Sequence, residues 1–375
     1  MPIHSDKHPF YQQLAVRIRE LGGMLNAHLH LDRAGTLDDR YMESAHHRIL
    51  ETSHISLHQK HHLIHDLHAG PAYDTEDLTR RIQTHLDIMV ACNTRRADTL
   101  VDVTADRVGL NALRLMKEIK QQRAHEIDLR IGAYSPLGFL DSEPQRWEIF
   151  EQGAAEADFI AALPEADDHD EYPNHIGFME HCQRTLEIAK KRQCMIHVHT
   201  DQRNEPGESG TERTLEAVRR YGAPVSPTGE PMVWVVHMIS PSTYDDARFE
   251  KLVAGLLDLN IGVICCPSAA IGMRQLRPMM TPTYNSIPRV LELAAAGVHV
   301  RLASDNIADI CSPTTTADLT DEVFMLSAAV RYYHVGVLAR LAAGQKLSDE
   351  ERQRVSEHLA CNDREISKVL GSVRH

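Results

Sequence analysis

Short apolar segments alternate with longer amphipathic segments along most of the chain. Eight apolar segments have the length and composition of buried strands: Met24–His28, Leu100–Thr104, Leu129–Tyr134, Phe159–Leu163, Met195–His199, Val233–Met238, Ile261–Cys265 and Val298–Ala303. Segments between them carry apolar residues at helical spacing and are predicted helices: Asn111–Lys120, Gly177–Lys191, Thr211–Arg219, Tyr244–Leu259 and Pro288–Ala295. Nearly continuous apolar strands that alternate with helices indicate a parallel sheet covered on both faces.

The number of strand–helix repeats favours a closed sheet over an open one. Eight repeats match a (β/α)8 barrel, which typically takes about 250 residues, better than a doubly wound sheet. From about Ala317 the pattern predicts helices that pack outside the barrel. Because the chain has no linker and no internal repeat, we expect residues 1–375 to form a single domain.

The composition is that of an ordinary globular protein and excludes several classes. The net charge of −13 comes from 40 basic and 53 acidic residues, without a basic stripe, so nucleic-acid binding is not expected. No apolar run approaches the ~20 residues of a membrane helix, and the N-terminal sequence lacks a secretory signal. The seven cysteines are scattered without C-x-x-C spacing, so we expect reduced thiols and a cytoplasmic location.

Metal-binding residue types stand at the ends of four predicted strands. His28 and His30 are two residues apart, so in a strand both imidazoles point the same way. Because barrel sites form at the C-terminal strand ends, five distant residues could converge there: His28, His30, His199, His237 and Asp305. His197 shares a strand face with His199 and is an alternative ligand, although His199 is closer to the rim. Imidazole and carboxylate suit Zn²⁺, Fe²⁺ or Mn²⁺.

This ordered pattern resembles the amidohydrolase superfamily, and within it the cytosine deaminase-like branch. The resemblance runs from about Asn26 to Pro313, and its most specific motifs are His28-Leu-His30-Leu-Asp-Arg33, Val198-His199-Thr-Asp and Leu302-Ala-Ser-Asp305-Asn306-Ile. It implies one divalent metal, Zn²⁺ first, held by His28, His30, His199 and Asp305. It further implies that His237 holds and polarises the attacking water and that Asn306 touches a small-molecule substrate.

Three departures separate this chain from the family pattern. The deaminases have a proton-shuttling glutamate where this chain has Gln202, and a carboxamide cannot cycle a proton. The loop after the third strand, where cytosine deaminase reads the pyrimidine edge with a glutamine, is Ser135-Pro136-Leu137. Finally, the short segment before the first strand and the helical end predict that the family's small β-sandwich domain is missing.

Cytosine is therefore a poor substrate candidate, and a related reaction is favoured. The leading hypothesis is a metal-dependent hydrolase that cleaves a C–N bond, of amide or amidine type, in a small nitrogen-rich or cyclic compound. Asp305 would be the general base with His237 assisting, and Gln202 and Asn306 would orient the substrate. Arg33 either binds an anionic substrate group or pairs with a structural carboxylate. The alternatives are a deaminase of an amino-heterocycle and a non-catalytic metal- or ligand-binding barrel.

The sequence leaves the roles of several other residues open. Possible replacements for the family glutamate are Asp201, Glu205 and Glu208, although a solvated loop is the simpler interpretation. Pocket-lining positions are possible for Asp102, Asp106 and Cys311. Eight histidines between His46 and His68 indicate either metal capture or a pH-responsive lid, and we favour a polar helical excursion with most rings in water. A homo-oligomer is possible.

Overall fold

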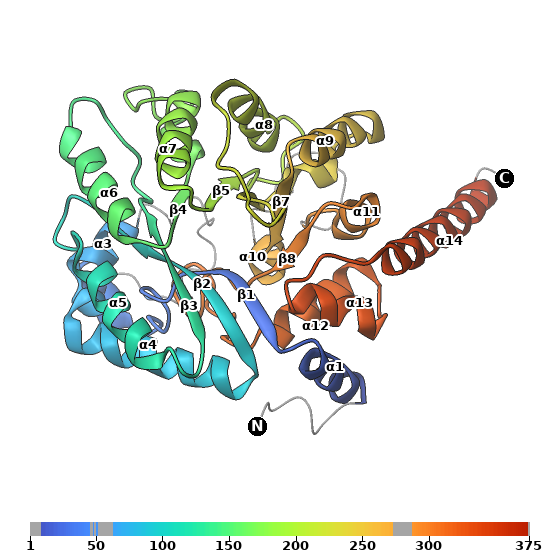
Figure 1. The fold of residues 1–375 in the computed structure, drawn as a ribbon, viewed down its shortest axis with the longest axis horizontal. Helices are drawn as coiled ribbons and strands as arrows, with labels where there is room; N and C mark the ends of the chain where they lie inside the picture. The colour runs from blue at the N-terminus through green and yellow to red at the C-terminus, as the bar shows by residue number, and fades with distance from the viewer. Residues whose placement is uncertain (1–8, 46–47, 49, 52–62, 273–286, 374–375) are drawn as a thin grey trace.

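The computed structural model describes residues 9–45, 48, 50–51, 63–272 and 287–373. Its strands form one eight-stranded parallel sheet in chain order (Figure 1). The strands are β1 Met24–Leu29, β2 Thr94–Asp102, β3 Asp128–Tyr134, β4 Phe159–Ala162, β5 Ile196–Thr200, β6 Val233–His237, β7 Ile261–Cys265 and β8 Val300–Leu302. The predicted strands agree with these within two residues at each end, except that β2 begins six residues before Leu100. Its early part escaped the apolar pattern because Arg96 there pairs with the buried Asp98.

The sheet closes between β1 and the segment that follows β8. The backbone N–H of Asp305 donates to His28 O at 2.9 Å, and His30 N–H donates to Asp305 O at 3.2 Å. The side chain of Asn26 spans the same seam, since it donates to Ser304 Oγ at 2.9 Å and accepts from Ser304 N at 3.0 Å. The predicted (β/α)8 barrel is therefore confirmed, and its closing seam carries three of the expected site residues.

Helices cover the outer face of the barrel. The α-helices are α1 Pro9–Glu20, α3 Ile64–Ala69, α4 Thr75–Ala91, α5 Asn111–Arg123, α6 Pro144–Glu156, α7 Phe178–Arg192, α8 Gly210–Tyr221, α9 Asp246–Asp258, α10 Pro267–Ile271, α11 Val290–Ala296, α12 Leu319–Val330, α13 Val335–Ala342 and α14 Asp349–Val373. Short 3₁₀ helices lie at η1 Asp39–Ala45, η3 Pro71–Tyr73, η4 Pro164–Asp167 and η5 Ser240–Thr243. The five predicted helices are present within three residues at each end.

The C-terminal part is helical, as expected. It comprises α12, α13 and α14, and α14 extends away from the barrel (Figure 1). Within the described ranges all eight strands belong to the barrel, so the β-sandwich domain is absent from them, as predicted. None of the described helices combines the length and the apolar composition that crossing a bilayer requires.

Alternation along the strands separates two layers of the core. On β6, Val233 and Val235 pack with the helices, whereas Trp234 and Val236 belong to a separate apolar group in the barrel interior. The same alternation separates two adjacent cysteines at the end of β7. Cys265 packs with the outer layer, and Cys266 belongs to the interior group. Side chains at the interior positions therefore reach the rim where the strands end.

Candidate metal centre

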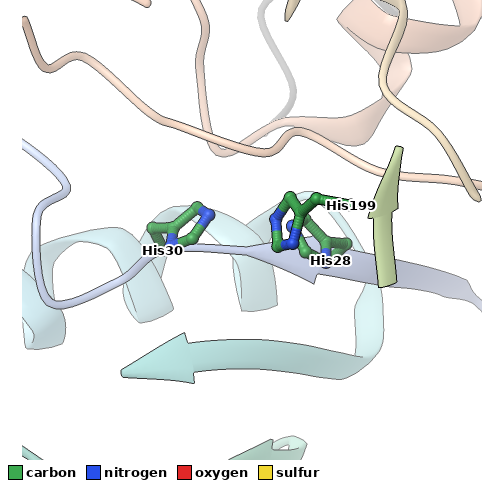
Figure 2. A group of neighbouring side chains, drawn as sticks. All are labelled: His28, His30 and His199. Carbon is green, nitrogen blue, oxygen red and sulfur yellow. The ribbon is translucent and has the colours of Figure 1, made fainter. Parts of the chain in front are cut away.

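Three histidines that the sequence predicts as ligands meet inside the rim of the barrel (Figure 2). His28 belongs to β1, His30 follows it directly, and His199 belongs to β5. All three side chains are buried, and one ring nitrogen from each lies within 4.8 Å of those of the other two. This spacing is compatible with three ligands around one cation.

Asp305 reaches the same group from the segment after β8. Its Oδ1 lies 3.4 Å from His30 Nε2 and 3.9 Å from His28 Nε2. Asp305 also forms a second compact group with His237 and Cys266, whose donor atoms again lie within 4.8 Å of one another. Sequence reasoning missed Cys266, although its position directly after a predicted strand was a signal that could have found it.

His237 and Asp305 have a backbone conformation that is uncommon outside glycine. The φ angle is 76° at His237 and 61° at Asp305. Such residues cost roughly 1–3 kcal/mol and persist where the surrounding structure holds them. Because Val236 faces the barrel interior, regular alternation would turn His237 outward. The left-handed conformation ends this alternation, and the His237 ring lies 5.5 Å from the ring of His199.

Hydrogen bonds to the second ring nitrogen orient two of the histidines. His199 donates its Nδ1–H to the carbonyl oxygen of Ala162 at 3.0 Å, so the lone pair of the neutral ring is on Nε2. Nδ1 of His28 lies 3.1 Å from Nδ1 of His197, so one of these rings donates to the other. His197 belongs to neither donor group, and its contact with Nδ1 orients the ring of His28. The geometry therefore favours His199 over His197 as the ligand on β5.

The protonation states fit a cation site. Burial, followed by the nearby rings of His199 and His197, holds the pKa of His28 well below its usual value of 6.5. Burial also lowers the pKa of His237 to about 4. Neutral imidazole is the form that binds a divalent metal. Among the described residues, Nε2 of His28 and Nδ1 of His237 are buried without a hydrogen-bond partner, which is rare unless another group completes the site.

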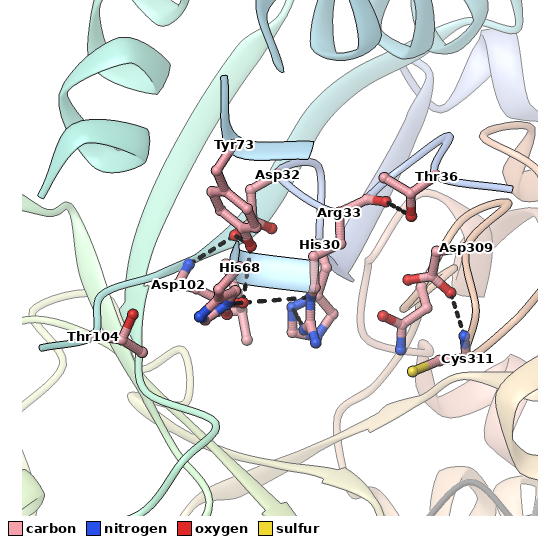
Figure 3. A network of polar contacts seen from close by, with 12 residues as sticks. His30, Asp32, Arg33, Thr36, His68, Tyr73, Asp102, Thr104, Asp309 and Cys311 are labelled. Carbon is pink, nitrogen blue, oxygen red and sulfur yellow. Dashed lines mark hydrogen bonds and ion pairs between the residues drawn. The ribbon is translucent and has the colours of Figure 1, made fainter. Parts of the chain in front are cut away.

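Arg33 lies beside His30 in a buried polar network (Figure 3). Its Nη2 lies against His30 Nδ1, and its Nε lies 3.7 Å from Asp102 Oδ2. Asp32 is part of the same network, because Tyr73 donates to its Oδ2 at 3.0 Å. Of the two roles that the sequence left open for Arg33, pairing with a structural carboxylate is the one that these contacts support.

His68 is the last histidine of the histidine-rich segment, and its ring contacts two carboxylates of the barrel. Its Nε2 lies 3.0 Å from Asp102 Oδ2 and its Nδ1 lies 2.7 Å from Asp106 Oδ2. Burial by itself lowers the pKa of His68, but the hydrogen bonds to both carboxylates outweigh burial and raise the pKa to about 9. The prediction of solvated rings is wrong for His68, which is 1% exposed, and right for His65. His46, His47, His54, His58, His61 and His62 lie outside the described residues.

Gln202, at the position of the family glutamate, contacts a carboxyl group from another strand end. Its Nε2 donates to Oε2 of Glu165 at 3.2 Å. Glu165 belongs to η4, directly after β4. Burial, then the carboxylates of Glu208 and Asp201, raise its pKa well above the ordinary value. Sequence reasoning missed Glu165, because only the barrel brings the segments after β4 and β5 together.

The replacement acids considered from the sequence have structural contacts of their own. Asp201 is buried, so a solvated loop is wrong for it, and its carboxylate accepts from the backbone N–H groups of Gly210 and Thr211 at the start of α8. Glu208 accepts from the N–H of Arg203 at 2.9 Å. Glu205 is half-buried. None of these contacts brings an acid to Gln202 as Glu165 does.

Three further residues lie near the rim. Asn306 is buried and donates from Nδ2 to Asp305 Oδ1 at 3.3 Å, and its Oδ1 has no hydrogen-bond partner among the described residues. Tyr134, which ends β3 and was not predicted, lies with its ring 5.1 Å from that of His199. Cys311 is half-buried, and its N–H donates to Asp309. Asn306 is thus in position to accept a hydrogen bond from a bound molecule.

The chain is similar to known proteins mainly in its fold. No family model matches the chain. A protein of Haemophilus influenzae described as uncharacterized is 27% identical over 278 residues, 72% of this chain and 92% of that protein. The structure of a 5-methylcytosine deaminase from Klebsiella pneumoniae, liganded with phosphonocytosine, has a TM-score of 0.64 at 19% identity, over 90% of this chain and 82% of that one.

An N-isopropylammelide isopropylaminohydrolase from Burkholderia multivorans is similar to the same extent. Its TM-score is 0.62 at 19% identity, and the match covers 85% of this chain and 72% of that enzyme. At identities this low the matches show a shared fold. The activities named for the two enzymes are not thereby assigned to this chain. The chain therefore shares the (β/α)8 barrel fold of these two enzymes.

Proposed function

We propose that this protein is a metal-dependent hydrolase of a C–N bond in a small nitrogen-rich or cyclic compound. The observation that carries the proposal is the convergence of His28, His30, His199 and Asp305 at one buried point of the rim. These four side chains would hold one divalent cation, with Zn²⁺ the first candidate and Fe²⁺ or Mn²⁺ the alternatives. A cation held there would lower the pKa of its bound water to about 7 and would polarise the bond under attack.

The side chains around the cation would divide the proton transfers between them. Asp305 takes a proton from the attacking water and delivers it to the departing nitrogen. His237, neutral because burial lowers its pKa to about 4, accepts a hydrogen bond from the same water. Asn306 offers its unpartnered Oδ1 to an N–H of the substrate. These roles need no charged histidine, in agreement with the buried setting.

Gln202 would orient the substrate and take no part in proton transfer. Because Nε2 of Gln202 donates to Glu165, its carboxamide oxygen is left to accept from a bound molecule. Arg33 packs against the ring of His30 and lies beside Asp102, and we assign it to positioning that ring in place of substrate binding.

Deamination of an amino-heterocycle is the second candidate, and one observation favours it. Burial raises the pKa of Glu165 well above the ordinary value, which favours the protonated form of this carboxyl. It contacts Gln202, which stands where the deaminases carry their shuttling glutamate. Release of ammonia, as opposed to ring opening or loss of an alkylamine, would identify this reaction.

The test is a substrate panel combined with one substitution. Zn²⁺-loaded protein is incubated with cyclic amides and with amino- and alkylamino-substituted pyrimidines and triazines, and amine, ammonia and carboxylate products are measured. Asp305→Asn should lower turnover by roughly 10²- to 10⁴-fold, because it removes the general base. Asp309→Asn is the matched control, since Asp309 is similarly buried and, in the part of the chain that the structure describes, accepts from the backbone N–H groups of Cys311 and Ser312. Near wild-type turnover by Asp305→Asn would refute the proposed role.

A further inference from the structure

A second set of metal donors lies beside the proposed ligands. His237, Cys266 and Asp305 come from the ends of three consecutive strands, and their donor atoms lie within 4.8 Å of one another. Each of the three side chains is buried, with at most 3% exposed. Imidazole nitrogen, thiol sulfur and carboxylate oxygen are three donor types that bind divalent zinc or cobalt.

An unpartnered group provides independent support for a ligand here. Nδ1 of His237 is buried and has no hydrogen-bond partner among the described residues. Buried polar atoms without partners are rare, and this one belongs to the donor group itself. The left-handed backbone at His237, with φ of 76°, is also what brings its ring into the barrel interior against the strand alternation.

The number of donors exceeds what one cation takes. His28, His30 and His199 form one compact group, and His237, Cys266 and Asp305 form another. A tetrahedral zinc ion uses four ligands, whereas six side chains converge at this rim. Asp305 connects the groups, because its Oδ1 lies 3.4 Å from His30 Nε2. A carboxylate in that position is suited to bridge two cations.

We propose that His237, Cys266 and Asp305 form a second, thiolate-containing site for a divalent cation, bridged to the first site by Asp305. The inference rests on the metal site of the proposed function and extends it: when the second cation is bound, His237 is its ligand and no longer accepts from the water. When the second cation binds, the Cys266 thiol loses its proton to solvent and the sulfur becomes the ligand. The chain would then hold a two-metal centre whose second position prefers metals that accept sulfur.

Cobalt substitution tests this site without any substrate. The full chain is loaded with Co²⁺ and desalted, and the near-ultraviolet thiolate-to-cobalt absorption and the cobalt content per chain are measured. We expect the absorption band in the wild type. Cys266→Ser should lose the band and bind one ion fewer per chain. Cys265→Ser is the matched control, since Cys265 is the buried neighbour that faces the outer helices, and it should retain both the band and the full cobalt content.

The following results would refute the second cation site. A wild-type protein without the thiolate band refutes it regardless of how the variants fold. A band that persists in Cys266→Ser, or equal cobalt content in the wild type and that variant when both are folded, refutes it as well. Refuting the second site would not refute the proposed function. A protein that binds one ion and cleaves a C–N bond, but lacks the thiolate band, would have the first site alone.

Discussion

The ion pairs of His68 with two carboxylates can be tested through the pH dependence of the free energy of unfolding. His68 donates to Asp102 and to Asp106 and is 1% exposed. Despite burial, these two carboxylates raise its pKa from 6.5 to about 9. A difference of about 2.5 units corresponds to about 3 kcal/mol of native-state stabilisation, at 1.36 kcal/mol per unit.

The sign follows from the direction of the shift. A pKa that is higher in the folded than in the unfolded protein stabilises fully below the unfolded value of about 6.5. The stabilisation is lost as the pH rises through about 9, where His68 loses its proton in the folded protein. His68→Gln removes the titrating group, so its free energy of unfolding lacks this pH-dependent contribution.

Urea unfolding of the wild type and of His68→Gln at several pH values measures the effect. The difference in the free energy of unfolding should be largest near pH 6 and should shrink by about 3 kcal/mol by pH 10. His65→Gln, in the same segment but exposed, is the control and should differ little from the wild type at any pH. A wild-type to His68→Gln difference that stays constant from pH 6 to 10 would contradict the double ion pair.

Two further substitutions test the supporting residues of the centre. Arg33→Lys removes the planar guanidinium that packs against the ring of His30 and should weaken Zn²⁺ binding by about 10- to 100-fold, measured by competition with a chelator. Unchanged affinity would favour a role for Arg33 in substrate binding. Gln202→Glu places a second carboxyl against Glu165, so the pair shares a proton and one pKa rises further. The acid limb of the pH–rate profile should then move to higher pH, and an unmoved limb would indicate that neither group affects the reaction.

The sequence by itself determined the barrel and the proposed first metal site. The apolar segments predicted the strands because a parallel sheet is buried on both faces, so each strand reads as an apolar run. The rule that parallel strands end at one rim then placed His28, His30, His199 and Asp305 together, although they are far apart in the chain. The early start of β2 escaped this reasoning, because the charges of Arg96 and Asp98 neutralise each other only when paired in the fold.

Only the tertiary structure decided which neighbours these residues have. Glu165 meets Gln202, His68 meets Asp102, and Cys266 meets Asp305, in each case through packing of segments distant in the chain. The backbone at His237 breaks the strand alternation on which sequence reasoning depends. A periodic pattern specifies which face of an element is buried, but the partner of a buried polar group depends on how strand ends and loops pack around the rim.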